Sequence, residues 1–472
     1  NIEMKSKKPE EQNNKRYLVA SLYYVIGNVI GQGCVLLSSI IFTRIMSKDA
    51  YGLVNTYAAW VLVLNTFIGL NLFITVRNAY LDYKEDYEAF QSSVLLLSLL
   101  SGVFFTGVIV GGVRILGIHT EISVILIATI QAMSLHTINF QMAVWSMENR
   151  YKLRTMLLVA PNIFHTVMSV VLIFIFPQHQ YFAKICGNSF GMAVFAIGII
   201  FYTFHNASCK GAARFWKYAV LISVPAIMST LSDLLLMQSD RIMLTNMVGA
   251  SETAVYSLVY NIGSILIALY TAINGSWTPW FYKKLDEEKM DEIHRVQKMY
   301  VYVFTYMAIG LLTISPEVVK VLSPKTYWTG IGYVNLIVIA SFLIYLYAFF
   351  TTYLMYLKKT GTIAVNTMIA AILNIILNYF LIPRYKAYGA AYATIISYAV
   401  LFILQYMAMN KQGRAVFDLK SIGMGITIIV VYGGLFYCIK ENWIIRYGIV
   451  AIMLVIAFVV FLEYKKGRWK EE

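Results

Sequence analysis

Charged residues are scarce in this 472-residue sequence. Asp, Glu, Lys and Arg make up 13% of it, whereas hydrophobic residues make up 59%. A soluble globular domain carries about 25% charged residues, so this chain has about half of the charge that such a domain presents to water. The mean hydropathy is +0.66. The composition therefore excludes a water-soluble globule of this size and indicates an integral membrane protein.

Motifs for catalysis, nucleotide hydrolysis and metal binding are also missing. The sequence has no Walker-type phosphate loop, no Ser/His/Asp set and no GxGxxG fingerprint. The four cysteines contain no CxxC pair, which excludes a zinc site or a disulfide framework of known spacing. His136 and His165 lie in apolar segments without metal-ligand spacing, and we interpret them as packing residues. We expect a protein that is not an enzyme, holds no cofactor and does not hydrolyse nucleotide.

Long apolar runs dominate what the sequence does contain. A helix needs about 20 apolar residues to cross a bilayer core, and fourteen stretches meet this length. They are approximately 17–43, 51–76, 90–113, 122–145, 153–177, 181–205, 216–239, 254–277, 296–319, 331–357, 361–383, 388–409, 419–439 and 443–464. The sequence therefore predicts an all-α integral membrane protein with about fourteen transmembrane helices. The charged stretch 278–295 between two spans is interpreted as a solvated amphipathic helix.

The distribution of basic residues predicts the orientation. Residues 1–16 are polar and lead into a full-length span, so we expect no cleavable signal peptide. With this arm in the cytoplasm, the inner side holds 27 Lys and Arg and the outer side holds 11, which together make the 38 of the chain. Basic residues concentrate on the cytoplasmic side of membrane proteins. We therefore expect both termini in the cytoplasm and basic contacts with anionic lipid headgroups, and no nucleic-acid partner.

Two matching segments indicate an internal repeat. An Arg-Ile-Met followed by Tyr-x-Leu-Val occurs at Arg44 and again at Arg241, 197 residues later, and an apolar run ends at Pro177 and again at Pro383, 206 residues later. Doubled architecture is common among transporters. We predict two pseudo-symmetric six-helix lobes around a central cavity, with two further C-terminal helices. The predicted units are a basic arm (1–16), an N-lobe (17–210), a C-lobe (211–410), and the last two spans with a basic tail (411–472).

Ionisable residues within the spans are the candidates for function, since each costs about 3 kcal/mol at a helix centre. Asp233 and Asp240 lie seven residues apart on one helix face, and Arg241 follows directly. Arg44 occupies the matching end of the first span, and Arg77 ends the second. One reading places the three arginines in a cavity facing phosphate or sugar groups. The other has Arg44 and Arg241 at the interface and Asp240 neutralising its neighbour. Asp233 could also couple transport to protons or sodium.

Four segments carry a resemblance to a known family. These are SSIIFTRIMSKDAYGLVNTYAAW, SDRIMLTNMVGASETAVYSLVYNIG, NGSWTPWFYKKL and LKKTGTIAVNTMIAAILNIILNYFLIPRYKAYGAAYATIISY. They resemble the polysaccharide biosynthesis/export family, the Wzx-type O-antigen, capsule and exopolysaccharide flippases of the multidrug/oligosaccharidyl-lipid/polysaccharide (MOP) superfamily. The resemblance covers the chain in order. It implies a V-shaped cavity between two lobes, with charged residues in the first and seventh spans that match Arg44, Asp233, Asp240 and Arg241 by position only.

The resemblance also implies a cargo and a location. The cargo would be an undecaprenyl-diphosphate-linked oligosaccharide, moved by alternating access across the bacterial cytoplasmic membrane with energy from an ion gradient. Polymerase and chain-length proteins of the same pathway would be partners. A drug/cation antiporter and a lipid II flippase of the same superfamily stay open as alternatives, as does a membrane-embedded polymerase. We expect charge reversal at Asp233 or Arg44 to weaken delivery of glycan to the surface.

Overall fold

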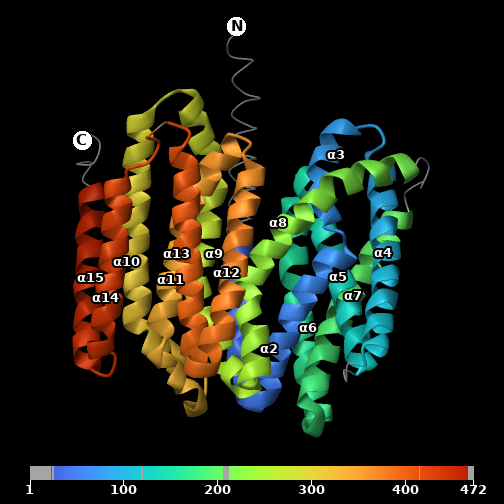
Figure 1. Ribbon diagram of the computed structural model, residues 1–472, viewed down its shortest axis with the longest axis horizontal. Coiled ribbons are helices and arrows are strands. Elements are labelled where there is room, and N and C mark those ends of the chain that lie inside the picture. The colour runs from blue at the N-terminus through green and yellow to red at the C-terminus, as the bar shows by residue number, and fades with distance from the viewer. Residues whose placement is uncertain (1–22, 24–25, 118–120, 206–211, 414, 466–472) are drawn as a thin grey trace.

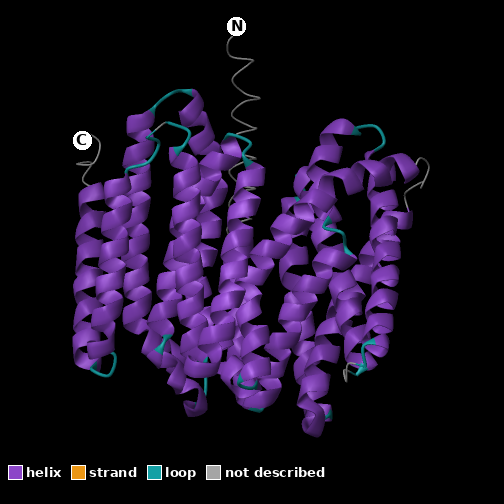
Figure 2. Cartoon of the chain, in the orientation of Figure 1, coloured by secondary structure: helices purple, strands orange, loops and turns teal. Residues whose placement is uncertain are grey.

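The described part of the chain is built from helices joined by short turns (Figures 1 and 2). The computed structural model describes residues 23, 26–117, 121–205, 212–413 and 415–465. The elements are a first helix Ile26–Ile45, α2 (Lys48–Ile68), η1 (Leu72–Thr75), α3 (Val76–Asp82), α4 (Tyr87–Ile115), α5 (Ile122–Met147), α6 (Tyr151–Ile175), η2 (Pro177–His179), α7 (Gln180–His205), α8 (Ala212–Met247), α9 (Ala250–Asp286), α10 (Met290–Leu322), η3 (Lys325–Gly332), α11 (Val334–Tyr356), α12 (Thr360–Tyr385), α13 (Ala387–Asn410), α14 (Leu419–Ile439) and α15 (Trp443–Lys465). The predicted arm 1–16 lies outside the described residues.

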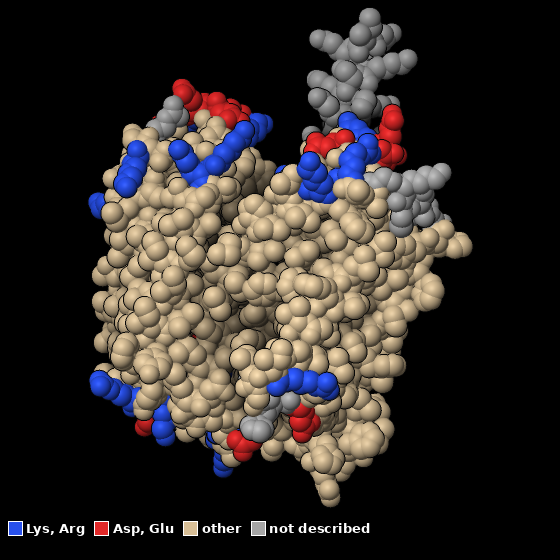
Figure 3. Space-filling view, turned by 45° about the vertical axis from the view of Figure 1, so that its right-hand side comes forward, with Lys and Arg blue, Asp and Glu red and all other residues tan. Residues whose placement is uncertain are grey.

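The helices are long and apolar enough to cross a membrane. In the described part, thirteen helices meet this criterion, and α15 contains a further apolar stretch, Trp443–Val459. Each of the fourteen predicted spans corresponds to one of these helices. Figure 3 shows a broad band without charged side chains between two levels where Lys, Arg, Asp and Glu gather. This band is the surface that hydrocarbon covers in a multi-pass membrane protein.

We refer to the two ends of the helix bundle as its upper and lower faces. The upper face carries α3 and the turn between α9 and α10, and the lower face carries the turn between the first helix and α2, together with η3 (Figure 1). Helices α4 to α7 stand on one side of the bundle, and α9 to α13 stand on the other. Helices α14 and α15 lie beyond α10, with α14 against α10 and α11.

Helix contacts repeat between the two sides. In the first, α5 packs against α2, α4, α6 and α7, and in the second, α11 packs in the same way against α9, α10, α12 and α13. The closest pairs are α6 with α7 and α12 with α13, which occupy equivalent places in this scheme. Chain order adds the first helix to the first set, here called the N-terminal group, and α8 to the second, here called the C-terminal group. Two pseudo-symmetric groups of six helices with two further helices are therefore confirmed. The exact ranges predicted for the lobes stay a prediction.

Helix α8 contacts both groups. Its first turns belong to the N-terminal group, where Phe215 packs against Phe90 and Trp216 donates to the Ser93 carbonyl. Its later turns pack along α12, and Leu244 joins the main core. Pro225 lies inside this helix, where a proline removes one backbone hydrogen bond and favours a bend. The two groups are thus connected by one continuous helix as well as by contacts between them.

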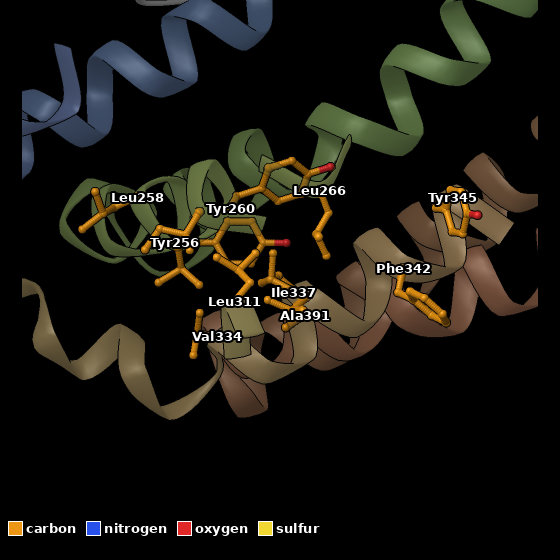
Figure 4. Close-up of a cluster of buried hydrophobic side chains, with 14 of the residues drawn as sticks. Tyr256, Leu258, Tyr260, Leu266, Leu311, Val334, Ile337, Phe342, Tyr345 and Ala391 are labelled. Carbon is orange, nitrogen blue, oxygen red and sulfur yellow. The ribbon is translucent and has the colours of Figure 1, made fainter. Parts of the chain in front are cut away.

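The C-terminal group has the larger apolar core. Figure 4 shows Tyr256 and Tyr260 of α9 beside Ile337 and Val334 of α11, with Ala391 of α13 close by. Aromatic rings stack within the same core, and the rings of Phe304 and Tyr345 lie 3.8 Å apart. The same core also includes buried residues of the N-terminal group, such as Phe42, Tyr51 and Val54, so apolar side chains pack the two groups against each other.

Two predicted segments differ from the structure. The second span was expected to run to residue 76, but α2 ends at Ile68, and a turn at Gly69, Leu70 and Asn71 separates it from η1 and α3. Leu70 and Asn71 have left-handed backbone angles, which end a helix. The stretch 278–295 is not a separate amphipathic helix: α9 and α10 both extend into it and meet at a three-residue turn before Met290. Its lysines and glutamates form exposed ion pairs around Glu287.

Candidate functional site

The two groups of helices are joined at the lower face by polar contacts, here called the lower seal. Asp49 accepts a hydrogen bond from Ser251 at 2.6 Å, and Lys48 donates to the Thr326 carbonyl at 3.1 Å. Gly52 lies so close to the backbone of Ala250 that a Cβ atom at this position would overlap the Ala250 carbonyl. The beginnings of α2 and α9 therefore touch directly.

Arg44 is part of the lower seal. Its guanidinium donates to the carbonyls of Val321 at 2.7 Å and Leu322 at 3.3 Å, the last residues of α10. Helix C-termini present unpaired carbonyls and the negative end of the helix dipole, which a cation stabilises. The side chain is exposed at the lower face. The structure thus places Arg44 at a contact between the groups, and a role in binding cargo stays a prediction.

Arg77 lies at the opposite end of the molecule. It belongs to α3 on the upper face, where its side chain is exposed. Arg77 therefore lies at the upper rim of the molecule. Figure 3 shows the surface hollowed between the groups at this end, with Lys and Arg on both sides.

Asp240 and Arg241 are buried near the lower end of α8. Asp240 accepts hydrogen bonds from the Tyr256 hydroxyl at 2.6 Å and from the Arg241 backbone N–H at 2.8 Å. The Arg241 guanidinium does not form an ion pair with Asp240; it donates to Gln238 and lies 4.4 Å from the centre of the Tyr260 ring. The Asp240 carboxylate therefore contacts α9 as well as its own helix, and its role beside Arg241 stays a prediction.

Asp233 lies two turns before Asp240 on the same side of α8. Because seven residues make about two helical turns, the two carboxylates lie on the same face of this continuous helix. Asp233 is exposed, whereas Asp240 is buried among hydrogen-bond partners. The Asp240 surroundings continue into α12, where Ser239 donates to Asn374 and Asn378 donates to the same Asn374 oxygen. The sequence-based pairing of the two aspartates on one face is confirmed.

A polar cavity lies between the groups just above the lower seal. Its volume is about 230 Å³, and it is here called the Lys184 pocket. Its lining residues are Cys34, Val35, Ser38, Ser39, Phe42, Tyr51, Val54, Asn55, Ala58, Asn162, His165, Thr166, Lys184, Asn188 and Asn261. Most come from the first helix, α2, α6 and α7, and Asn261 comes from α9. The cavity is therefore walled by both groups of helices.

Two glycines bring the walls of this pocket together. Gly187 and Gly191 of α7 face the backbones of Ser169 and His165 of α6, and a Cβ atom at either glycine would overlap these atoms. Small residues four apart let transmembrane helices approach closely. Ser169 then donates to Asn188 at 3.1 Å across the contact. The close approach of α6 and α7 positions Lys184 and Asn188 opposite His165.

Lys184 is the cation of this pocket. Its ammonium donates to Asn188 at 3.0 Å and lies 3.4 Å from the centre of the Phe42 ring. The side chain is 4% exposed. A cation over an aromatic ring gains electrostatic stabilisation when it is desolvated. None of the lining residues is acidic, so the pocket offers a positive charge together with amide and hydroxyl groups.

The structure brings only some of the predicted residues together. Asp240 and Arg241 lie at the contact of α8 with α9, where Arg241 lies over the Tyr260 ring, and Asn261, next to Tyr260 in sequence, lines the Lys184 pocket. Arg44 and Arg77 lie on opposite faces. The sequence analysis missed Lys184 because it lies only four residues into its helix and was counted among the basic residues of the outer side. The sequence feature that could have identified Lys184 is its place within an apolar span, because a charged side chain is costly in a membrane.

No group of three or more His, Cys, Asp or Glu that could hold a metal ion occurs among the described residues. His165 contacts Asn162 at 3.2 Å, and His136 packs against Gly69, where a Cβ atom would overlap its ring. The polar groups of the Lys184 pocket are suited to hydrogen bonding with an uncharged or anionic organic molecule rather than to metal coordination.

Comparisons with known proteins agree with this fold. The family model described as "Polysaccharide biosynthesis protein" matches residues 20–285, more than half of the chain. A "Probable flippase AglR" from Haloferax volcanii is 25% identical over 197 residues, which is 39% of this chain and 40% of that relative. The solved structure of "Lipid II flippase MurJ, inward closed conformation" has a TM-score of 0.71 at 13% identity, covering 95% of this chain and 99% of that one. An inward-facing multidrug resistance MATE transporter of the MOP superfamily has a TM-score of 0.57 at 13% identity, covering 83% and 99%.

Proposed function

Since the chain belongs to the polysaccharide biosynthesis protein family, we propose that it is a flippase-type transporter of the MOP superfamily that carries lipid-linked saccharides across a membrane. The name of the Haloferax relative supports a flippase, and the likeness to MurJ supports a fold that suits one. Because the aligned region spans 40% of that relative, its activity supports the proposal without settling the cargo.

The proposed cargo is an undecaprenyl-diphosphate-linked oligosaccharide repeat unit. It would pass from the inner to the outer leaflet of the bacterial cytoplasmic membrane for assembly of O-antigen, capsule or exopolysaccharide. The upper face would be cytoplasmic, as would both termini, because basic residues favour that side. Lys and Arg gather at the upper rim on both sides of the hollow in Figure 3, where they would meet the phosphates of an incoming lipid. Polymerase and chain-length proteins would receive the cargo on the other side.

One observation carries the proposal: the two groups of helices meet around a polar cavity, and polar contacts accompany the apolar residues that pack there. Thr56 and Thr245 hydroxyls lie 2.5 Å apart across the contact, and Gln32 donates to Ser264 at 2.8 Å. These polar contacts can separate and reform because water can replace each hydrogen bond. Alternating access requires this property, since the groups must open on one side while they close on the other.

The energy would come from an ion gradient rather than from a cofactor. The carboxylates of α8 are the proposed places for a proton or a sodium ion. Asp240 lies in a network of hydroxyl and amide groups that reaches Tyr256 and, through Ser239, Asn374. Asp233 is exposed on the same helix face. A carboxylate within the membrane is costly unless it is paired or functional, which supports a coupling role for these residues.

The test is transport by the full chain in sealed proteoliposomes. A fluorescent saccharide linked to undecaprenyl diphosphate is placed in both leaflets, and a membrane-impermeant quencher reports the fraction that is accessible over time. We expect exchange between leaflets that protein-free vesicles lack and that an imposed proton or sodium gradient accelerates. In cells, deletion should trap lipid-linked repeat units on the cytoplasmic leaflet.

Three outcomes would favour other functions. Efflux of a cationic dye without exchange of lipid-linked saccharide would identify a drug/cation antiporter. Exchange of lipid II alone would identify a peptidoglycan-precursor flippase. Single units displayed outside the cell but left unlinked after deletion would identify a polymerase.

A further inference from the structure

We propose that the Lys184 pocket binds one compact oxyanion of the cargo, either the carboxylate of an acidic sugar or a phosphate group, and so selects cargo by charge. This inference rests on the proposed function and adds to it the chemistry of one recognition site. It follows from three properties of the pocket, which are the missing counter-charge, the supply of hydrogen-bond donors and the size.

The missing counter-charge is the first property. Lys184 is buried and its hydrogen-bond partner, Asn188, is neutral. Burying an ammonium group without an anion is unfavourable, and the Phe42 ring offsets only part of this cost. Arg446, another buried cation of the described chain, has a carboxylate partner in Glu317. An incoming oxyanion would give Lys184 the counter-charge that the protein itself does not supply.

Hydrogen-bond donors around Lys184 are the second property. Asn55, Asn162 and Asn261 line the pocket with amide groups that each keep one N–H for a ligand, and Ser38 adds a hydroxyl group. His165 donates from Nε2 to the Asn162 oxygen, so its buried Nδ1 atom is an acceptor without a partner among the described residues. A buried polar atom without a partner is costly. A sugar hydroxyl would satisfy Nδ1, while the amide groups and Lys184 would hold the oxyanion.

Size is the third property. A volume of about 230 Å³ equals that of about eight liquid water molecules, at roughly 30 Å³ each. Sites for larger ligands occupy about 300–1,000 Å³. The pocket therefore admits one sugar ring or one phosphate group, and a whole oligosaccharide would extend beyond it. One acidic group of the repeat unit would be recognised here, while the remainder of the cargo lies elsewhere between the groups of helices.

The position of the pocket connects binding with transport. Asn261 of α9 donates to Ser39 of the first helix at 3.2 Å, so the two groups meet at the wall of the pocket. An oxyanion held by Lys184 and Asn261 would contact both groups at once. A ligand shifts a conformational equilibrium only through different affinities for the two states. A bound oxyanion would therefore favour the arrangement described here, in which the lower seal is closed.

The experiment measures equilibrium binding to the full chain in nanodiscs. The probes are undecaprenyl diphosphate carrying a neutral disaccharide, the same lipid carrying a disaccharide that ends in glucuronate, and inorganic diphosphate. Lys184→Gln removes the charge with little change in size, and Lys184→Arg keeps it. Lys298→Gln is the matched control, because Lys298 is exposed near the upper end of α10.

A second variant separates loss of binding from loss of folding. Asn188→Asp places a carboxylate where the Asn188 oxygen now accepts from Lys184 at 3.0 Å. This internal anion should stabilise the folded chain and raise its melting temperature. It should nevertheless weaken oxyanion binding as Lys184→Gln does, because the new carboxylate pairs with the Lys184 ammonium and competes with the ligand for it. Loss of binding with raised thermal stability cannot be ascribed to misfolding.

We expect Lys184→Gln and Asn188→Asp to weaken binding of the glucuronate probe by about tenfold or more, as for loss of a charge-assisted hydrogen bond. Lys184→Arg and Lys298→Gln should bind as the native chain does. If only the glucuronate probe is affected, the oxyanion is a sugar carboxylate. If all three probes weaken equally, it is the phosphate of the lipid carrier. Unchanged binding of every probe would overturn the inference.

The binding assay and the transport assay can contradict the two proposals separately. A chain that exchanges lipid-linked saccharide but is indifferent to Lys184→Gln in both assays would retain the proposed function and lose the oxyanion pocket. A chain that binds the probes through Lys184 but exchanges no lipid-linked saccharide would retain the pocket and lose the proposed function.

Discussion

Lys184 and Arg446 are both buried cations near the lower end of a membrane-spanning helix, yet their surroundings differ. The Arg446 guanidinium pairs with both oxygens of Glu317 and donates to the Thr313 carbonyl at 3.0 Å. Lys184 has only an amide and an aromatic ring. A cation with a carboxylate partner connects helices, whereas one without a counter-charge is available for a ligand. We therefore assign Arg446 to the attachment of α15 and Lys184 to recognition.

The Arg446–Glu317 pair should dominate the attachment of α15 to α10. We expect Arg446→Met to destabilise the chain by about 3 kcal/mol, since it leaves Glu317 without its partner in a membrane environment. Thermal unfolding of the purified protein in detergent would measure this. Lys440→Met, in the turn before α15, is the control and should have little effect.

A double replacement tests the same pair from the other direction. Glu317→Leu combined with Arg446→Met removes both charges, and we expect it to recover most of the lost stability, because replacing a buried pair with apolar residues is often neutral. If the double variant is less stable than either single one, the attachment depends on packing rather than on the pair.

At the residue scale, the sequence predicted positions better than roles. Asp240 and Arg241 were identified because charged residues stand out in an apolar span, and both are buried between helices. Lys184 and Arg446 were overlooked because each lies a few residues from a helix end, where a long basic side chain commonly reaches the membrane surface. Only the packing of α6 on α7, and of α10 on α15, shows that these two side chains turn inward.

At the scale of helices, apolar run length located the spans but not their ends. The apolar sequence of α9 and α10 ends near the membrane surface, but the backbone hydrogen bonds of both helices continue into the charged segment between them. The break after α2 depends on left-handed backbone at Leu70 and Asn71; Asn is common in this conformation, but Leu is not. There, Asn71 donates to Thr230 of α8 at 2.8 Å, a contact between distant segments that no local pattern reveals.

The contact of α6 with α7 gives a prediction for helix packing. We expect Gly187→Ala to cost about 1–3 kcal/mol, as other overpacked positions do, because the added Cβ would overlap the Ser169 backbone. Gly198→Ala on the same helix is the control, since nothing lies within 4 Å of a Cβ there. The melting temperatures of the Gly187→Ala and Gly198→Ala variants would test this prediction. Equal values would mean that α6 and α7 can separate without loss of stability.

At the scale of the whole molecule, the repeat could be predicted because both halves contain the same short signatures around Arg44 and Arg241. The sequence did not show which polar site each half contributes. The N-terminal group contributes most of the lining of the Lys184 pocket, whereas the C-terminal group holds Asp240 within its hydrogen-bond network. Equivalent helices thus carry different polar residues, and this difference appears only when the helices are placed side by side.

The lower seal gives a prediction about movement of the whole molecule. Asp49 and Ser251 lie in hydrogen-bond contact across it, so cysteines at both positions, in a background without the native cysteines, should form a disulfide on oxidation. We expect the cross-link to stop exchange of lipid-linked saccharide and reduction to restore it. Each single cysteine variant serves as a control. Full transport by the cross-linked chain would show that the lower seal does not open during the cycle.

The lower seal also has a consequence for the rate of a transport cycle. Four of its polar contacts, made by Arg44, Lys48, Asp49 and Thr56, are hydrogen bonds, each worth about 0.5–1.5 kcal/mol net. Together they favour the closed state by about 2–6 kcal/mol. One charge crossing a potential of about 100 mV supplies about 2.3 kcal/mol. The hydrogen bonds of the seal therefore lie within the energy that about one to three ions deliver, so opening and closing can repeat with every molecule of cargo.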